Sequence, residues 1–354
     1  MPLTIDQLDT PCVIVDLDRA EANLQRAQDY ADAHGLKLRP HIKTHKLPRF
    51  AKRQVALGAV GITCQKLGEA EVMADAGLDD IFLPYNIMGT EKLHRLRRLN
   101  ERLTLAVTAD NAPTIEGYAA TFAEAGKPLR VLVECDTGMG RCGVQSPEEA
   151  VALAALIAGS RGLVFEGIMT YPPAGSPGEA RERLGAVIAA LADAGLPPAI
   201  VSTGGTPDLW SAHETEAATE YRPGTYIYLD RYQVAKGVGT LEDCALTVLT
   251  TVVSRPTEDR AIIDAGSKAL TSDLLGMTGY GLVLGYPDAV VTGLSEEHGT
   301  IDLSASERKP EIGERLRILP NHACPVSNLF DRVHLVAGDH VVATESVAAR
   351  GRVD

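Results

Sequence analysis

The sequence is poor in aromatic residues, and its cysteines show no paired spacing. Phe, Trp and Tyr together make up 5% of the 354 residues, with a single tryptophan. Such a composition, with abundant Ala, Val, Leu and Gly, is typical of an α/β protein in which buried strands alternate with helices. The six cysteines are scattered along the chain. This argues against a disulfide scaffold and predicts a reduced, cytoplasmic setting.

Long hydrophobic runs and an excess of positive charge are absent as well. No stretch approaches the roughly 18 apolar residues of a membrane helix, and the N-terminal residues lack the basic and apolar regions of a secretory signal. The formal net charge of −13 argues against nucleic acid or an anionic membrane as a partner. Neither nucleic acid nor a membrane is therefore expected as a partner.

Eight short apolar runs alternate with amphipathic segments between residues 20 and 240. The segment 147–160, for example, opens with Pro147 and two glutamates, which is a typical helix start. Strand and helix alternating eight times predicts a (β/α)8 TIM barrel. A doubly wound open sheet is the alternative, because strand order cannot be read from the sequence. The expected strands are 37–44, 60–65, 80–86, 103–108, 130–137, 164–171, 198–205 and 219–226.

The residue pattern changes after residue 240. Residues 241–354 contain apolar runs separated by turns and show no helical periodicity, which predicts a separate, C-terminal all-β domain. Residues 1–19 contain the strand pattern PCVIVDLD, and we expect this N-terminal strand to join the β domain. The predicted organisation is therefore an N-terminal strand at 1–19, a barrel at 20–240 and a β-rich domain at 241–354.

Polar side chains gather where the expected barrel strands end. Barrels place their chemistry at these C-terminal ends, and the loops after strands seven and eight commonly hold a phosphate through backbone N–H groups. Glycine in such loops lets a phosphate approach the amides. One amine together with two Gly/Thr loops indicates pyridoxal phosphate, with Lys43 forming the imine. The strand-end residues are Lys43, Gln65, Asn86, Arg141, Tyr171, Thr203, Gly204, Gly205, Thr206, Gly224, Thr225 and Tyr226.

The chain resembles the alanine-racemase-like family of pyridoxal phosphate enzymes (fold type III), and within it the branch of the D-threonine aldolases and D-serine dehydratases. The resemblance extends over nearly the whole chain, and RPHIKTHK and PNHACP are specific to this branch. It implies a barrel followed by a β domain. The motifs that carry it are TPCVIVDLD, RPHIKTHK, KLGEAEVMADAG, DTGMGRCGV, VSTGGTPD, RPGTYIYLDR, SEEHG and PNHACPVSNL.

The resemblance also implies roles for the strand-end residues. Lys43 matches the Schiff-base lysine of the family, Arg141 the arginine near the cofactor's phenolic oxygen, and Tyr171 the tyrosine at the pyridine nitrogen. The loops 203–206 and 224–225 match the phosphate loops. A phenol leaves the pyridine nitrogen unprotonated and gives a weaker electron sink than a carboxylate partner does, so the reaction needs help from another group.

His322 and Cys324 are the candidates for that help. Their spacing predicts that both side chains lie on one face of an extended segment. Imidazole and thiolate suit a borderline divalent metal, with zinc first by softness; without context, such a pair is more often incidental. The resemblance implies a catalytic divalent metal (Zn, Mn or Mg) at these two residues. Closer to the lysine, His41 and His45 flank Lys43 on alternate positions, where they could lower the pKa of the amine or relay protons.

A metal beside pyridoxal phosphate indicates a lyase acting on D-3-hydroxy-α-amino acids. The first hypothesis is D-threonine aldolase-type cleavage to glycine and an aldehyde. The alternative is β-elimination by a D-serine or D-3-hydroxyaspartate dehydratase, giving a 2-oxo acid and ammonia, and the resemblance associates a cysteine at position 324 with dehydratases. An amino-acid racemase and a non-catalytic pyridoxal phosphate-binding protein are less favoured. The resemblance further implies a homodimer.

Overall fold

The computed structural model describes residues 3–354, which form two compact units. The barrel unit comprises residues 27–43, 48–224 and 352–354. The β unit comprises the described residues up to Arg26 together with residues 44–47 and 225–351. The division at Gly224–Thr225 precedes the change in residue pattern at 240–241. The chain also changes unit between Lys43 and Thr44, inside the motif RPHIKTHK.

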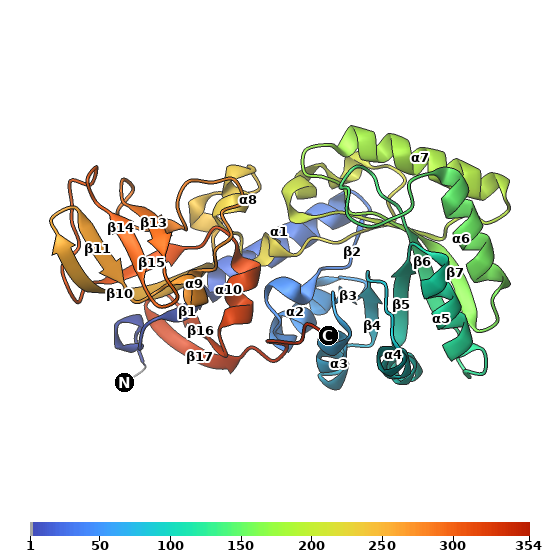
Figure 1. Ribbon diagram of the computed structural model, residues 1–354, viewed down its shortest axis with the longest axis horizontal. Coiled ribbons are helices and arrows are strands. Elements are labelled where there is room, and N and C mark those ends of the chain that lie inside the picture. Colours follow the sequence, from blue (N-terminus) through green and yellow to red (C-terminus); the bar gives the residue numbers. More distant parts are fainter. Residues whose placement is uncertain (1–2) are drawn as a thin grey trace. The chain divides into compact units, whose positions relative to one another are not determined.

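The barrel unit is built on eight parallel strands, several of which are labelled in Figure 1. Their order is β2-β9-β8-β7-β6-β5-β4-β3, and an isolated parallel bridge between His41 and Thr63 joins the two ends of this order. The predicted (β/α)8 barrel is therefore confirmed. The strands are β2 (Lys37–Leu38), β3 (Ile62–Thr63), β4 (Asp80–Leu83), β5 (Thr104–Ala109), β6 (Leu129–Glu134), β7 (Leu163–Met169), β8 (Ile200–Thr203) and β9 (Glu220–Tyr221).

Helices follow the strands and lie around the outside of the barrel (Figure 1). Helix α6 begins as its sequence predicts, because Pro147 occupies the first turn and the Ser146 side chain accepts the N–H of Glu149. The helices are α1 (Leu17–Ala33), α2 (Pro48–Leu57), α3 (Leu67–Asp75), α4 (Thr90–Arg102), α5 (Ala112–Phe122), α6 (Pro147–Gly159), α7 (Pro177–Asp193) and the 3-10 helix η3 (Thr206–Glu214). None of the helices among residues 3–354 combines the length and apolar character needed to cross a membrane.

One layer of side chains fills the barrel between four adjacent strands. Phe82, Ala106, Leu132 and Met169 come from β4, β5, β6 and β7, and all four are buried. The barrel is thus a packed core, and its polar chemistry is confined to the strand ends and loops.

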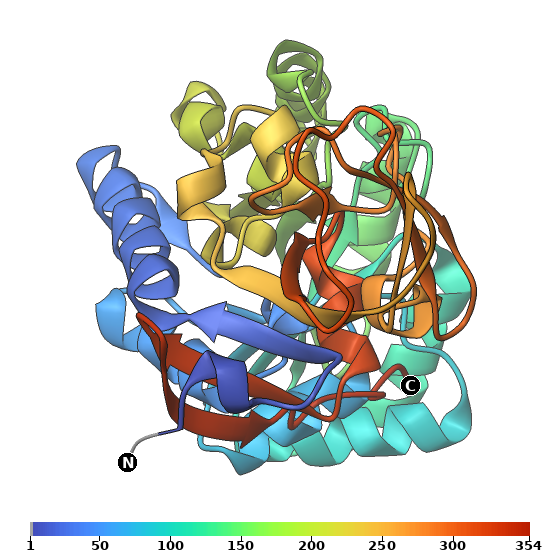
Figure 2. The ribbon, with the colours of Figure 1, turned by 90° about the vertical axis from the view of Figure 1, so that its left-hand side faces the viewer.

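The β unit contains a nine-stranded sheet of order β11-β14-β13-β12-β15-β10-β1-β16-β17. Strand β1 (Cys12–Asp16) pairs antiparallel with β10 and parallel with β16, and Figure 2 shows it beside the red strands β16 and β17. The other strands are β10 (Leu246–Thr257), β11 (Arg260–Ile263), β12 (Leu282–Val283), β13 (Val290–Leu294), β14 (Gly299–Asp302), β15 (Arg315–Leu319), β16 (Arg332–Ala337) and β17 (His340–Ser346).

The β unit also contains short helices that the sequence pattern did not predict. They are α8 (Arg231–Ala235), α9 (Ser267–Leu270) and α10 (Ala323–Leu329), together with the 3-10 helices η1 (Ile5–Gln7), η4 (Thr225–Ile227) and η5 (Leu241–Asp243). Each is too short to show a 3.6-residue periodicity, which explains why the region after residue 240 read as free of helix. Helix α10 matters most, because it carries the motif PNHACP.

Candidate active site

Lys43 lies in a 3-10 turn rather than at the end of a strand. Strand β2 ends at Leu38, and residues Ile42–Thr44 form the 3-10 helix η2. The expectation that His41, Lys43 and His45 share one face of a strand is therefore wrong, because a 3-10 turn does not alternate side chains between two faces. Lys43 itself is half-buried.

His41 holds the turn that carries the lysine. Its Nδ1 accepts the backbone N–H of Lys43 at 3.3 Å, and its Nε2 lies 2.9 Å from Oε1 of Gln65. Because Nδ1 accepts, the ring hydrogen is on Nε2 and is donated to Gln65. Gln65 in turn donates to the carbonyl of Pro84 at 3.3 Å. These contacts give His41 and Gln65 the geometry of groups that orient the Lys43 backbone.

His45 is fully buried, and its Nδ1 accepts the backbone N–H of Leu47 at 3.0 Å. The next residue, Lys46, has a positive φ of 55° and donates from Nζ to the carbonyl of Ala349 at 3.3 Å. These bonds tie residues 44–47 into the β unit. His45 therefore has the contacts of a structural residue of this segment.

The two predicted phosphate loops meet in the barrel unit. The backbone N–H of Gly224 donates to Oγ1 of Thr206 at 3.1 Å, so the loop after β9 touches the loop after β8. Gly204 has a φ of 118°, and a Cβ there would lie 2.7 Å from the Tyr221 ring. A Cβ on Gly205 would lie 3.1 Å from Cε2 of Tyr171. The missing side chains of Gly204 and Gly205 thus let the rings of Tyr221 and Tyr171 pack directly against the loop after β8, and glycine backbone of this kind is what a phosphate-binding loop requires.

The remaining residues of the predicted loops are distributed as follows. Thr203, at the end of β8, and Thr206, at the start of η3, are both buried. Thr225 and Tyr226 are buried in η4 and pack with the β unit. The Thr225 hydroxyl lies 3.5 Å from Sγ of Cys324, so the structure gives this threonine a thiol neighbour.

Arg141 and Tyr171 contact each other at the C-terminal side of the barrel strands. The Arg141 guanidinium carbon lies 4.9 Å from the centre of the Tyr171 ring, which is a cation–π contact. Glu134, at the end of β6, lies near enough for Arg141 to act on its charge. Burial raises the pKa of Glu134 to about 7, although the positive charge of Arg141 opposes the shift.

The sequence interpretation missed Arg222. This arginine is buried; it donates to the carbonyl of Thr170 at 2.8 Å and to Oγ of Ser202. Burial lowers its pKa to about 10, and the nearby carboxylates, Glu220 first, limit the fall. Its signal in the sequence was its place in RPGTY, directly before the Pro-Gly of a predicted phosphate loop.

His322 and Cys324 lie at the start of α10 and not in an extended segment. His322 is the N-cap residue, and Cys324 is the second residue of the helix. The two side chains are close enough for Cys324 to act on the pKa of His322. The prediction that an extended backbone places them on one face is therefore wrong, and the cap geometry brings them together instead.

The surroundings of this pair favour a positive charge. The Cys324 Sγ lies 3.1 Å from Oγ1 of Thr44, and the His322 Nδ1 lies 2.8 Å from Oδ2 of Asp273. Burial lowers the pKa of His322, but the hydrogen bond and the charge of the Cys324 thiolate, followed by Asp273, outweigh it and raise the pKa to about 9. An imidazole nitrogen and a thiolate sulfur are donor types that fit a borderline divalent cation.

His322 and Cys324 would supply two protein ligands to a metal ion. Within residues 3–354, the structure contains no group of three or more His, Cys, Asp or Glu side chains able to hold a metal ion. A metal bound here would keep coordination positions open to water or substrate, as catalytic metals do.

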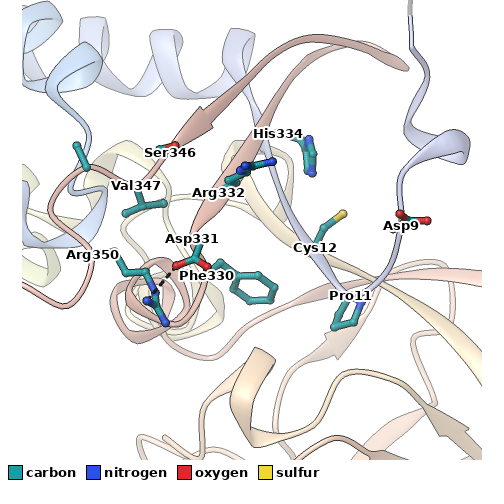
Figure 3. A pocket seen from close by; sticks show the side chains of 11 residues that line it. Asp9, Pro11, Cys12, Phe330, Asp331, Arg332, His334, Ser346, Val347 and Arg350 are labelled. Atoms are coloured by element: carbon teal, nitrogen blue, oxygen red, sulfur yellow. Dashed lines mark ion pairs between the residues drawn. The ribbon is translucent and has the colours of Figure 1, made fainter.

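A separate cavity of about 800 Å³ lies in the β unit, between the start of β1 and strands β16 and β17 (Figure 3). Asp331 and Arg350 form an ion pair of 3.0 Å at its edge. The predicted site residues do not line this cavity.

Comparison with known proteins covers the whole chain. The family model "Alanine racemase, N-terminal domain" matches residues 15–232, and the model "Putative serine dehydratase domain" matches residues 245–336. The D-threonine aldolase of an Arthrobacter species is 35% identical over 98% of this chain and 93% of its own. The D-threo-3-hydroxyaspartate dehydratase of a Delftia species is 36% identical over 96% of this chain and 97% of its own.

Solved structures agree with these matches. The D-threonine aldolase from Filomicrobium marinum has a TM-score of 0.91 at 34% identity, covering 100% of this chain and 99% of that chain. Two structures of a D-threo-3-hydroxyaspartate dehydratase, both 33% identical, have TM-scores of 0.90 and 0.88 and cover 98% and 97% of this chain, and 96% and 98% of their own. In the first of these structures a histidine is replaced by alanine. In the second, the cysteine two positions later is replaced by alanine, and this variant is described as metal-free. The chain therefore belongs to the alanine-racemase-like family of pyridoxal phosphate enzymes, in the lyase branch of the D-threonine aldolases and D-serine dehydratases.

Proposed function

We propose that this chain is a lyase dependent on pyridoxal phosphate and a divalent metal. Its substrates are D-3-hydroxy-α-amino acids, and its main reaction is the D-threonine aldolase reaction, which releases glycine and an aldehyde. The full-length likeness to two D-threonine aldolases supports this choice.

Each part of the barrel site has a proposed role in holding the cofactor. The amine of Lys43 forms the covalent link, and His41 and Gln65 orient the backbone of that lysine. The loop residues Thr203, Gly204, Gly205 and Thr206 bind the phosphate together with Gly224 and Thr225, and Tyr226 supports the last of these loops. Arg141 faces the phenolic oxygen, and Tyr171 faces the pyridine nitrogen. The bound cofactor supplies an electron sink for the carbon at which a bond breaks.

His322 and Cys324 are proposed to hold the divalent metal. Zinc suits the imidazole–thiolate pair best, and manganese and magnesium are the alternatives. A cation at this pair would favour the deprotonated form of the substrate's β-hydroxyl. The metal would thereby assist bond cleavage, which the cofactor with an unprotonated pyridine nitrogen supports only weakly.

One observation carries the proposal that the metal and the lysine serve a single reaction. Thr44 follows Lys43 directly in the chain, and its hydroxyl contacts the Cys324 thiol at 3.1 Å. The candidate metal ligand therefore touches the residue next to the candidate cofactor lysine.

β-Elimination is the second candidate, and it too has a specific observation behind it. The His322 and Cys324 pair has the same residue types and spacing as the pair replaced in the dehydratase variants, one of which is metal-free. In this reaction Lys43 removes the α-proton, and the β-hydroxyl leaves. The products are ammonia and a 2-oxo acid.

Product analysis decides between the two reactions. The protein, pyridoxal phosphate and Mn²⁺ or Zn²⁺ are incubated with D-threonine, D-serine or D-threo-3-hydroxyaspartate, and L-threonine serves as the control. Glycine and aldehyde establish the aldolase, whereas 2-oxo acid and ammonia establish the dehydratase. If neither product forms from any D-substrate, both candidates are wrong.

We also propose a homodimer in the cytoplasm. The dimer follows from the family resemblance, and light scattering on the purified protein tests it. None of the six cysteines, all of which lie within residues 3–354, forms a disulfide, which agrees with a reducing compartment.

A further inference from the structure

Asp273 is the acidic neighbour of the proposed metal ligand. Its Oδ2 lies 2.8 Å from Nδ1 of His322. A carboxylate can only accept here, so the hydrogen of the ring is on Nδ1. Nε2, the other ring nitrogen, is then the atom whose lone pair is available to a metal once the cation replaces any proton there.

The loop that carries Asp273 is fixed by the residue next to His322. Asn321 is 1% exposed, and its Nδ2 donates to the carbonyl of Asp273 at 3.2 Å and to that of Gly279 at 2.8 Å. The loop also contains two non-glycine residues with positive φ, Thr271 at 63° and Leu275 at 50°. Backbone conformations of this kind persist where the surroundings hold them, and they concentrate at functional sites.

Asp230 fixes the other side of the pair. This carboxylate is fully buried, and its Oδ2 accepts the N–H of Ala323 at 2.9 Å. The peptide between His322 and Cys324 is thus held by one carboxylate, and the imidazole by another. Ligating histidines in metal sites almost always donate their second N–H to such a partner, which sets both the tautomer and the ring orientation.

We propose that Asp273 is a positioning residue that holds His322 with hydrogen on Nδ1 and with Nε2 directed to the divalent metal. This inference rests on the proposed function, since it assumes the metal at His322 and Cys324. It adds to that function a residue outside the motif PNHACP.

Metal affinity is the direct test. Asp273→Ala and Asp273→Asn are compared with the parent protein and with Asp288→Ala, which removes an exposed carboxylate from the same unit. Zn²⁺ or Co²⁺ alone is titrated against a chromophoric chelator. Loss of such a partner typically weakens metal binding by about 10- to 100-fold, and we expect this for alanine. Asparagine keeps an acceptor without the charge, so its loss should be smaller. Asp288→Ala should bind as the parent does.

A spectroscopic readout separates positioning from a general structural role. In the zinc-loaded parent, ¹⁵N spectra of His322 should show a protonated Nδ1 and a metal-bound Nε2. The cobalt-loaded parent should show a thiolate-to-cobalt band that weakens or shifts in Asp273→Ala, while the visible band of pyridoxal phosphate is unchanged.

The outcomes distinguish this inference from the function on which it rests. Parent-like metal affinity in Asp273→Ala, or metal on Nδ1, overturns the role of Asp273 and leaves the metal site in place. A parent protein that binds neither cation overturns the metal in the proposed function and the role of Asp273 with it. If Asp273→Ala fails to fold, parent-like affinity and spectra in Asp273→Asn still overturn the role.

Discussion

The Sγ atom of Cys324 lies 3.1 Å from Oγ1 of Thr44, although the two residues are 280 positions apart. Thr225 contacts the same sulfur at 3.5 Å. When the cysteine is a thiolate, both hydroxyls act as donors to it. The thiol proposed as a metal ligand therefore has two oriented neighbours, one from RPHIKTHK and one from RPGTY.

Replacing Thr44 with valine should weaken metal binding. Valine keeps the shape of the side chain and removes the hydroxyl donor, and hydrogen bonds to charged groups contribute about 1.5–3 kcal/mol. We expect the Kd for Zn²⁺ to rise by about 10-fold or more, whereas Thr44→Ser should bind nearly as the parent does. Equal affinities in the valine and serine variants would show that the hydroxyl does not support the thiolate.

Replacing Lys43 with alanine should abolish turnover and the visible absorption of the bound cofactor. The reason is that no other amine occupies the turn η2. Borohydride treatment of the parent followed by peptide mapping should place the cofactor on Lys43. Lys268→Ala, which removes an exposed lysine paired with Glu297, is the matched control. A label on Lys46 or Lys268 would refute the assignment.

Replacing Gly205 with valine should weaken cofactor binding before it affects stability. A Cβ at this position lies 3.1 Å from the Tyr171 ring, and the added methyl groups would fill the space proposed for the phosphate. We expect the Kd for pyridoxal phosphate to rise at least about 10-fold. The control is Gly185→Ala, because a Cβ on Gly185 meets no atom within 4 Å. Unchanged cofactor affinity in Gly205→Val is incompatible with the cradle.

Removing the metal should cost activity and leave the cofactor bound. A Lewis acid contributes several kcal/mol to the stabilisation of developing charge, so chelator or His322→Ala should lower kcat by orders of magnitude. The visible absorption band of the cofactor should persist. Added Mn²⁺ or Zn²⁺ should restore the activity of the parent protein after treatment with chelator. His94→Ala, at an exposed position on α4, should behave as the parent. Full activity in chelator would remove the metal from the mechanism.

The buried carboxyl of Glu134 should make stability depend on pH. Burial raises its pKa from 4.5 to about 7, so the folded state binds this proton more tightly than the unfolded state does. The contribution to stability is fully present below about pH 4.5 and is lost as the pH rises through 7. One pKa unit corresponds to about 1.4 kcal/mol, so the loss amounts to roughly 3 kcal/mol at most.

Urea unfolding at pH 5 and pH 8 measures this effect. The parent should lose more stability between the two values than Glu134→Gln does, because glutamine has no proton to lose. Glu307→Gln, an exposed control, should follow the parent. If the stability of the parent and of Glu134→Gln depends on pH in the same way, the pKa of the Glu134 carboxyl is not raised.

The sequence predicted the barrel well because its signals are local. Each barrel strand is an apolar run followed by an amphipathic segment. The eight runs overlap the eight observed strands, and β5, β6 and β7 each extend one residue beyond the predicted run. The turn around Lys43 was misread, because Ile42–Thr44 looks extended by composition and becomes a 3-10 turn only through contacts such as the bond from His41 to the Lys43 amide. A one-turn structure leaves no periodicity to detect.

The sequence predicted only those site residues that lie within a recognisable motif. Lys43, the Gly/Thr loops and the pair His322 and Cys324 lie in such motifs. Asp273 does not, because its bond to His322 joins residues 49 positions apart, and no local pattern reports such a contact. Arg222 stands in a motif, yet its burial follows from contacts with strands β7 and β8 that the sequence does not specify.

Strand β1 has a consequence for how the chain folds as it is made. It is synthesised well before its partners β10 and β16, where Val13 pairs with Val248 and with Val333. Val13, Ile14 and Val15 are fully buried in the finished sheet, so during synthesis they stay without their partners until β10 and β16 have emerged. A ribosome-bound chain should therefore expose β1 as an unpaired apolar strand for as long as the intervening barrel is being made, which makes this strand a natural point of chaperone contact.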